Sequence, residues 1–204
     1  MRNEGIHGEI VDALAGPGYV AVTGYAGVEN VLALLASLDT RQQAGRFHHA
    51  GIGVGAARAL APAIRGDRIS WIDGPEDCAE EAFLTRLDGL RVSSNHGLMM
   101  GLEALDMHFA SFAPGAGYVR HLDRSPTGVD LVVSVIYYLN QDWQAGDGGE
   151  LEIETANGLV LVEPRADTLV VFLSAQFSHT VLPAVRERCS LAGWFHRRPL
   201  GRPS

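Results

Sequence analysis

The stretch GYVRHLDRS, residues 117–125, ends a run of strand-forming residues with two side chains that bind metals, His121 and Asp123. Successive side chains of a strand point to opposite faces, so these two share one face and Leu122 takes the other. One small ion could therefore contact an imidazole and a carboxylate together. The alternative is a solvated turn, because a His-x-Asp pair also arises by accident. Partners elsewhere in the chain must decide between the two.

A third candidate ligand, His179, opens a later strand in the segment QFSHTVLPAVRERC. Two histidines and one aspartate on separate strands match the facial triad of non-haem Fe(II) oxygenases, which leaves coordination positions open. Structural zinc is the alternative, but such a site is closed by four ligands and the sequence offers no fourth in range. A 2-oxo acid could chelate the iron through two open positions and leave the last for dioxygen.

Arg188 could bind the far carboxylate of such an acid, because a planar guanidinium grips a carboxylate well in a buried pocket. Alternation along RCSLAGWFH places Trp194 on the same face as Arg188, so its indole could wall the same pocket. Tyr138 could present its hydroxyl there, with Ile136 on its own face. The alternative, a surface charge in the highly charged RERC segment, stays open on spacing alone.

The first half of the chain must supply helices that support this site. VENVLALLASLDTRQQAG spaces its apolar residues at helical intervals, and Gly45 is a plausible stop. PEDCAEEAFLTRLDGL predicts a second helix, with Pro75 near its start and an acidic first turn. Between the two lies the glycine-rich stretch HHAGIGVGAARALAPAIRGD. A loop so rich in glycine within a compact domain is usually functional or disordered.

From about Leu105 onward the pattern changes to short strands separated by turns, and we expect eight of them: LDMHFASF, GYVRH, DLVVSVIYYLN, GELEIET, GLVLVEP, DTLVVFLS, HTVLPA and RCSLAGWFH. ANG is a hairpin signal between two of them. DTLVVFLS is apolar without alternation, which predicts a strand covered on both faces. His108, on an apolar strand, is expected to be a hydrogen-bonded core residue. The fold class is α+β, mainly β: a sandwich or barrel backed by helices.

Composition narrows the class of protein. The 204 residues are 47% hydrophobic and 20% charged, as in an ordinary globular domain, and the net charge of −8 argues against a nucleic-acid partner. No apolar run approaches the ~20 residues that span a bilayer, and the start, MRNEGIHGEI, lacks a signal-peptide core. Cys78 and Cys189 form no CxxC motif. We therefore expect a soluble, cytoplasmic protein without a membrane partner.

Several segments in the same order resemble the prolyl 4-hydroxylases of the hypoxia-factor type, in particular their bacterial branch. These segments are IRGDRISWIDG, APGAGYVRHLDRS, VIYYLNQDWQAGDGGELEI and FSHTVLPAVRERCSLAGWF, and the resemblance runs from about Val11 to Phe195. It implies a double-stranded β-helix, also called a jelly-roll or cupin-like fold, in an Fe(II)- and 2-oxoglutarate-dependent dioxygenase. The whole chain, 1–204, would be one domain. Helical support and a substrate loop would occupy 1–104, and the β-helix core 105–196.

The resemblance also implies roles for individual residues. His121, Asp123 and His179 would hold iron and, with Arg188, form the catalytic set. Five residues would bind 2-oxoglutarate: Tyr138, Arg188, Ile136, Leu151 and Trp194. The glycine-rich stretch and the segment after it would be a loop and hairpin that close over the substrate. Arg65 and Asp67 would lie at the entrance, and Trp71 would join them in binding substrate.

The implied activity is hydroxylation of a prolyl residue at C4 in a protein, with conversion of 2-oxoglutarate and O2 to succinate and CO2. Ascorbate would support the iron. A prolyl residue on an exposed loop is the expected substrate, with elongation factor Tu as a candidate by analogy, and the enzyme would be a monomer. The alternatives are a hydroxylase of a free amino acid or another side chain, and a non-catalytic module that senses oxygen or 2-oxoglutarate.

Overall fold

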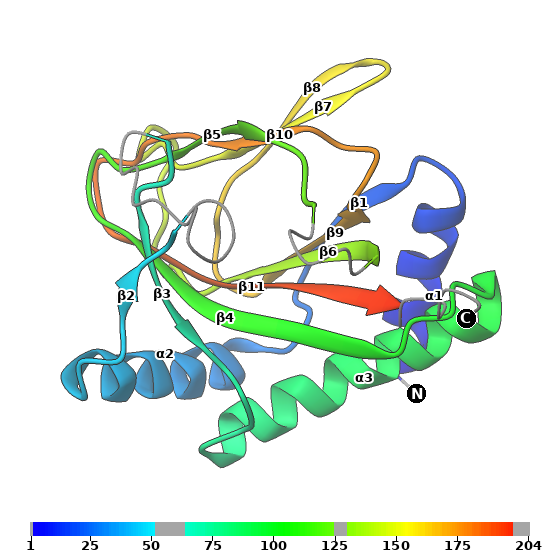
Figure 1. The fold of residues 1–204 in the computed structure, drawn as a ribbon, viewed down its shortest axis with the longest axis horizontal. Coiled ribbons are helices and arrows are strands. Elements are labelled where there is room, and N and C mark those ends of the chain that lie inside the picture. Colours follow the sequence, from blue (N-terminus) through cyan, green and yellow to red (C-terminus); the bar gives the residue numbers. More distant parts are fainter. Residues whose placement is uncertain (1, 52–63, 125–129, 198–204) are drawn as a thin grey trace, which may run out of the picture.

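The computed structural model describes residues 2–51, 64–124 and 130–197 (Figure 1). Its helices are α1 (Arg2–Ala15), α2 (Val28–Gln43) and α3 (Cys78–Leu98). Its strands are β1 (Tyr19–Thr23), β2 (His48–His49), β3 (Asp67–Trp71), β4 (Ala104–Phe112), β5 (Tyr118–His121), β6 (Asp130–Tyr138), β7 (Leu151–Thr155), β8 (Gly158–Val162), β9 (Thr168–Leu173), β10 (His179–Val181) and β11 (Arg188–Arg197). Residues 52–63, the middle of the glycine-rich stretch expected to cover the substrate, lie outside the described part.

The strands form two antiparallel sheets that face each other (Figure 1). The large sheet has the order β1-β9-β6-β11-β4-β3-β2, and the small sheet has the order β5-β10-β7-β8. From β4 onward the chain passes back and forth between the two sheets, so that most neighbouring strands are far apart in sequence, with the β7–β8 hairpin as an exception. This connectivity is that of a double-stranded β-helix, and the predicted fold class is confirmed.

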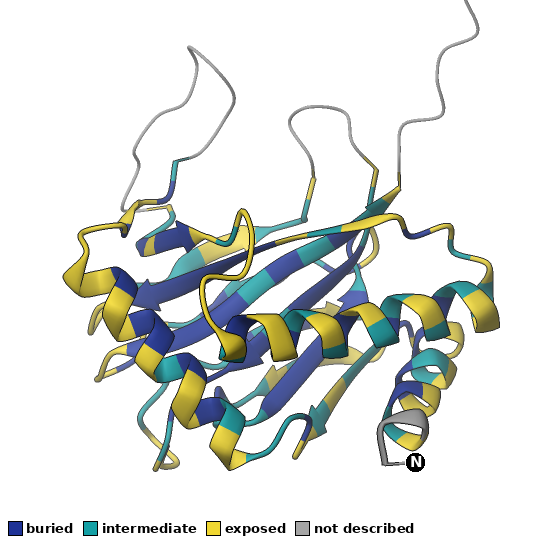
Figure 2. Ribbon diagram, turned by 90° about the horizontal axis from the view of Figure 1, so that it is seen from below, coloured by how far each residue is buried: buried dark blue, intermediate teal, exposed yellow. Residues whose placement is uncertain are grey.

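The three helices cover the outer face of the large sheet, as Figure 2 shows from below. Their buried stripes face the sheet and their exposed stripes face solvent, the pattern of amphipathic helices on a core. Alternate residues of the large sheet, such as Phe109, Val135 and Leu191, pack against helix residues such as Leu34 and Leu87 in one apolar cluster. A second cluster fills the space between the two sheets. The site must share that second space.

Most predicted elements are confirmed, including all eight strands of the second half. Strand β9, expected to be covered on both faces, is buried along nearly its whole length. Helix α2 ends just before Gly45, which has φ 70° as a left-handed stop requires. Helix α3 begins after Asp77, whose side chain accepts from the backbone N–H groups of Ala79 and Glu80, and it continues beyond the predicted end to Leu98. Strand β1 was not predicted.

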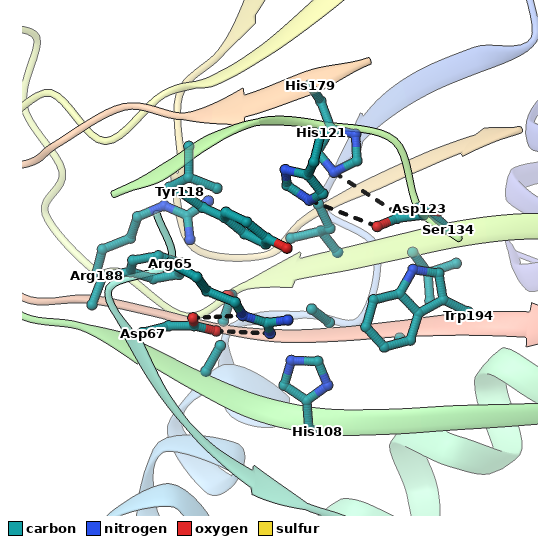
Figure 3. Close-up of a pocket in the computed structure, with 18 residues that line it drawn as sticks. Arg65, Asp67, His108, Tyr118, His121, Asp123, Ser134, His179, Arg188 and Trp194 are labelled. Carbon is teal, nitrogen blue, oxygen red and sulfur yellow. Dashed lines mark hydrogen bonds and ion pairs between the residues drawn. The ribbon is translucent and has the colours of Figure 1, made fainter. Parts of the chain in front are cut away.

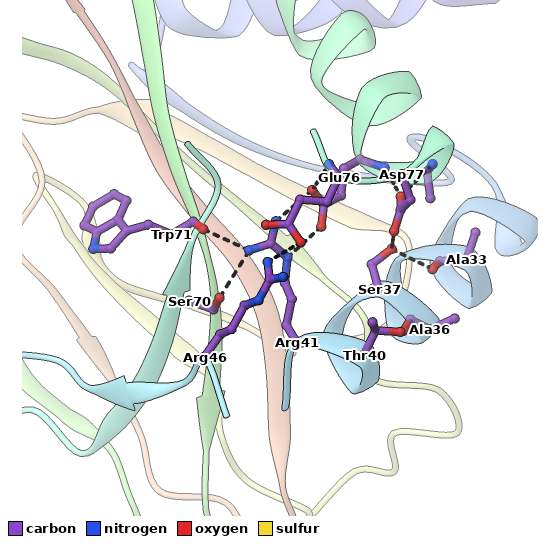
Figure 4. A network of polar contacts seen from close by, with 12 residues as sticks. Ala33, Ala36, Ser37, Thr40, Arg41, Arg46, Ser70, Trp71, Glu76 and Asp77 are labelled. Atoms are coloured by element: carbon purple, nitrogen blue, oxygen red, sulfur yellow. Dashed lines mark hydrogen bonds and ion pairs between the residues drawn. The ribbon is translucent and has the colours of Figure 1, made fainter. Parts of the chain in front are cut away.

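A buried arginine ties two helices to the inner hairpin strand β3 (Figure 4). Arg41 of α2 binds both carboxylate oxygens of Glu80 in α3, at 2.7 and 2.9 Å. Its remaining nitrogen donates to the Ser70 hydroxyl and, at 2.9 Å, to the carbonyl of Trp71. These contacts fix the C-terminal end of β3, at Ser70 and Trp71.

The strand register lines up side chains in rows across the inner face of the large sheet. We name each row after one member: the Arg188 row (Asp67, Phe112, Arg188), the Tyr138 row (Ile69, Ala110, Ser190, Tyr138), the His108 row (Trp71, His108, Ala192, Ile136, Val170) and the Ser134 row (Asp106, Trp194, Ser134, Phe172, Tyr19). Adjacent rows are two residues apart, about 6.6 Å along a strand. The row of a residue therefore gives its position along the space between the sheets, from the Arg188 end to the Ser134 end.

Among the described residues, no helix is long and apolar enough to cross a membrane.

Candidate active site

A cavity lies between the sheets and receives side chains from both (Figure 3). The small sheet contributes His121 and His179, with Asp123 just beyond the end of β5. The large sheet contributes Arg188 at one end and Trp194 toward the other. Residues that are distant in sequence therefore share one enclosed space.

The three predicted metal ligands converge. His179 and His121 stand directly opposite each other in the β10–β5 ladder, and Asp123 follows two residues after His121. One ligand atom from each lies within 4.8 Å of the others. Nε2 of His121 is 3.7 Å from Oδ1 of Asp123, and Nε2 of His179 is 3.8 Å from Oδ2. Two imidazoles and one carboxylate at these separations can hold one divalent ion on one face.

The protein also prepares both imidazoles for a metal. Nδ1 of His121 donates to the carbonyl of Val119 at 2.8 Å, and Nδ1 of His179 donates to that of Phe177 at 3.1 Å. A carbonyl can only accept, so Nε2 of each ring keeps its lone pair for the ion. Burial, assisted by the nearby His179, lowers the pKa of His121 to about 4. Both the tautomers and the protonation state suit metal binding.

A serine pair orients the carboxylate ligand. The Ser134 hydroxyl donates to Oδ2 of Asp123 at 2.6 Å, and the Ser134 and Ser174 hydroxyl oxygens are 2.9 Å apart. Ser174 is fully buried, and Ser134 nearly so. This contact fixes the rotation of the Asp123 side chain, which by itself has two nearly equivalent oxygens.

The opposite end of the cavity contains a buried cation that has no carboxylate partner among the described residues. Arg188 is 2% exposed, and its Nε donates to the carbonyl of Gly149 at 2.9 Å. Its guanidinium carbon lies 4.9 Å from the ring centroid of Tyr138 and 5.2 Å from that of Phe112. Within the described part of the chain, neither Arg188 Nη2 nor the Tyr138 hydroxyl has a hydrogen-bond partner.

These orphaned groups fit the far carboxylate of 2-oxoglutarate. Burial lowers the pKa of Arg188 and raises that of Tyr138, because it disfavours the charged form of each. A carboxylate bound here would neutralise the guanidinium and accept a hydrogen bond from the phenol. The metal triad lies across the cavity, so the 2-oxo acid end of the same molecule would reach the ion.

The predicted substrate residues occupy the side of the cavity formed by β3. Arg65 binds Asp67 in bidentate fashion, with Nε–Oδ1 at 2.8 Å and Nη2–Oδ2 at 3.0 Å. Its guanidinium also lies over the ring of Tyr118, 4.9 Å from the centroid. Both members of the pair line the cavity, and Asp67 is only 2% exposed. Trp71 is 39% exposed at the outer edge and touches the rings of His108 and Trp194.

Of the three residues predicted to line the 2-oxoglutarate pocket, two contact the cavity and one lies behind its wall. Ile136 and Trp194 line the cavity. Leu151 is fully buried in the cluster between the sheets and is not among the lining residues, so it supports the pocket from behind.

Sequence reasoning missed two residues of the site. Tyr118 stacks on His121 with ring centroids 3.6 Å apart, and Ser134 holds Asp123. Alternation from Ile136 could have found Ser134, which shares its face. The expectation for His108 was wrong in one respect: the ring is buried, but its Nδ1 has no hydrogen-bond partner among the described residues.

Fold and site together define a class of protein. A double-stranded β-helix that presents two imidazoles and a carboxylate to one ion, with an unpaired buried guanidinium across the cavity, is a mononuclear non-haem iron oxygenase that takes a 2-oxo dicarboxylic acid.

Comparison with known proteins gives the family. Residues 107–196 match the family model of the 2OG-Fe(II) oxygenase superfamily. The crystal structure of a Pseudomonas putida prolyl-4-hydroxylase is similar over 94% of this chain and 100% of that one, with 42% identity and a TM-score of 0.87. A Trichoplax adhaerens prolyl hydroxylase, solved with a hypoxia inducible factor peptide fragment, has 28% identity and a TM-score of 0.87, covering 99% of this chain and 95% of that one. The human Egl nine homolog 1 is 36% identical over 65% of this chain.

The chain belongs to the 2OG-Fe(II) oxygenase superfamily and, within it, to the prolyl hydroxylases. Fe(II), 2-oxoglutarate and O2 are accordingly its cofactor and co-substrates. The chain spans only 33% of the length of the human relative.

Proposed function

We propose that this protein hydroxylates a prolyl residue at C4 in a protein substrate. The observation that carries the proposal is the 42% identity to a prolyl-4-hydroxylase over that protein's full length, together with the converging triad. In the balanced reaction, one oxygen atom of O2 enters the C4–H bond as hydroxyl. The other enters 2-oxoglutarate, which loses CO2 and becomes succinate.

The residues divide this work by position. His121, Asp123 and His179 would hold Fe(II), which supplies the oxidising chemistry when bound. Arg188 and Tyr138 would bind the far carboxylate of 2-oxoglutarate and so set the direction of the molecule. The walls around them exclude water, which strengthens each of these charged contacts.

The substrate side supports a peptide more than a free amino acid. The Trichoplax relative was solved with a peptide, and in this chain the partly exposed Trp71 packs against His108 and Trp194, which line the cavity. We infer that Trp71 and the Arg65–Asp67 pair contact the peptide around the target ring. An exposed prolyl loop, such as one of elongation factor Tu, is the substrate that we propose. We further propose a cytoplasmic monomer whose iron is kept reduced by ascorbate.

Mass spectrometry of reaction products tests the function. The purified protein receives Fe(II), 2-oxoglutarate, ascorbate and air with prolyl peptides, including loops of elongation factor Tu, and in parallel with free proline. The expected result is a gain of one oxygen atom on a prolyl residue of a peptide, with one succinate formed per hydroxyl. Peptides deuterated at C4 of proline should lose one deuterium.

The control is His179→Ala, which should be inactive with every substrate. Oxygen gain on free proline alone would replace the peptide with an amino acid as substrate. Absence of 2-oxoglutarate turnover with any peptide or protein mixture would refute the hydroxylase and favour a non-catalytic sensor.

A further inference from the structure

His108 is a buried imidazole on the wall of the cavity that has no role in the scheme above. It is 1% exposed and contacts two indoles, with ring centroids 4.8 Å from Trp71 and 5.5 Å from Trp194. Figure 3 shows the ring directed from β4 toward the centre of the cavity, below the Arg65–Asp67 pair. A polar ring in this position needs a reason, because leucine or phenylalanine would pack there without polar atoms.

One nitrogen of this ring has unused hydrogen-bonding capacity. Nδ1 is buried and has no partner among the described residues, so it is available to a group that enters the cavity. Burial and then the charge of Arg65 lower the pKa of His108 to about 3, so the ring stays neutral at ordinary pH. A neutral imidazole offers one N–H donor and one acceptor.

The rows of the large sheet locate His108 relative to the two bound groups. His108 is four residues from Phe112, the neighbour of Arg188, which is about 13 Å along β4. Its own row is adjacent to the row of Ser134, the residue that holds the metal ligand Asp123. His108 therefore lies level with the metal end of the cavity, on the side that Trp71 borders. A substrate that approaches the ion from that side passes this ring.

A prolyl peptide offers hydrogen-bond acceptors to a donor at this position. Proline has no backbone N–H, so the polar atoms next to the target ring are carbonyl oxygens, which only accept. The carbonyl that precedes proline is joined to the ring through a planar tertiary amide, so the position of the ring restricts the position of this carbonyl. The nearby Arg65 already uses two of its donors on Asp67.

We propose, building on the proposed function, that His108 is a substrate-binding residue whose N–H donates to the carbonyl preceding the target proline. Free proline lacks this carbonyl, so the contact makes His108 a residue that distinguishes peptidyl proline from the free amino acid.

Two matched substitutions test the proposal with the peptide that the wild-type protein hydroxylates fastest. His108→Asn keeps an N–H donor near the position of Nδ1, whereas His108→Leu has a similar size and no donor. For each we measure the peptide KM and kcat, the 2-oxoglutarate KM, thermal unfolding, and binding of a fluorescent form of the peptide to the Mn(II)-loaded protein.

Loss of one hydrogen bond between neutral groups should raise the peptide KM and Kd of His108→Leu about tenfold, with His108→Asn within about threefold of wild type. The 2-oxoglutarate KM should not change in either variant. A second probe replaces the preceding carbonyl by a thioamide, a weaker acceptor. This change should weaken binding to the wild type and have little effect on His108→Leu, so that the two changes are not additive.

Three results would overturn the proposal: an unchanged peptide KM in His108→Leu, equal losses in the Asn and Leu variants at unchanged thermal stability, or wild-type binding that is indifferent to the thioamide. Binding of the thioamide peptide to the wild-type protein tests the proposal even if His108→Leu does not fold. Failure of the proposed function is a separate result, because there the wild type itself hydroxylates no peptide.

Discussion

Two arginines on the walls of the same cavity have opposite surroundings. Each guanidinium lies 4.9 Å from a tyrosine ring centroid, Arg65 over Tyr118 and Arg188 over Tyr138. Arg65 is paired with Asp67 in bidentate fashion, and the hydrogen bonds and charge of Asp67 raise the pKa of Arg65 against the opposing effect of burial. Arg188 has no carboxylate partner in the described chain, and burial lowers its pKa.

This difference separates a structural cation from a ligand-binding one. A buried guanidinium that already has a carboxylate has little charge left for a ligand, and it fixes the strand that carries its partner. A buried guanidinium without one destabilises the free protein and is stabilised by an incoming carboxylate. Both residues are arginines over a tyrosine ring, but the Arg65 side chain is 16% exposed and has a carboxylate partner, whereas Arg188 is 2% exposed and has none among the described residues.

The largest expected effect is on 2-oxoglutarate binding after removal of the unpaired cation. Arg188→Ala should weaken the binding of 2-oxoglutarate to the Mn(II)-loaded protein about a thousandfold, or ~4 kcal/mol, because a buried carboxylate would lose its charge partner. Calorimetric titration measures this. Arg188→Lys keeps the charge but not the planar guanidinium, so its affinity for 2-oxoglutarate should lie between those of the wild type and Arg188→Ala. An affinity within threefold of wild type in Arg188→Ala would place 2-oxoglutarate elsewhere.

The paired arginine should affect folding more than ligand binding. Arg65→Ala leaves Asp67 buried without its partner, which should lower the free energy of unfolding by ~3 kcal/mol in urea titrations. Affinity for 2-oxoglutarate should change less than threefold. The double variant Arg65→Ala, Asp67→Asn is the control and should recover part of the lost stability. A strong loss of 2-oxoglutarate affinity in the single variant would contradict the division between the two arginines.

The comparison also applies to the carboxylate of Asp123. Among the described residues, its Oδ2 accepts a hydrogen bond from the Ser134 hydroxyl. Ser134→Ala removes the donor to Oδ2 of Asp123 and should weaken Mn(II) binding about tenfold, as loss of an outer contact to a metal ligand commonly does. Ser134→Thr, which keeps the hydroxyl, is the matched control. Equal metal affinity in all three proteins would show that Asp123 is oriented without this hydroxyl.

The smallest effect concerns the stability of the free protein. Arg188→Met should leave the free energy of unfolding without 2-oxoglutarate within ~1 kcal/mol of wild type or raise it, since it removes an uncompensated buried charge. With saturating 2-oxoglutarate and Mn(II), the wild type should become the more stable protein. A destabilisation of several kcal/mol in the ligand-free state would show that Arg188 is a structural cation after all.

Sequence pattern alone was enough to predict most of the elements, though not strand β1, and the chemistry available to them. Alternation along the final strand placed Arg188 and Trp194 on one face of that strand. Alternation along GYVRHLD likewise placed His121 and Asp123 on a common face, because side-chain direction in a strand depends only on position along it. Apolar periodicity and turn residues gave the strands of the second half. The helix starting after Asp77 was recognisable but its end was not, since its last turns lack a strong stop before Met99, which takes the left-handed conformation.

Tertiary structure alone decided which of these groups have partners. The register that aligns Asp67, Phe112 and Arg188 joins strands separated by long stretches of chain, and no local pattern encodes it. The same is true of Leu151, which lies behind the cavity wall, and of His108, whose unpaired nitrogen depends on neighbours from two other strands. Hydrogen bonds and desolvation act over a few ångströms in space, so residue type can suggest a role but only the packed neighbours decide it.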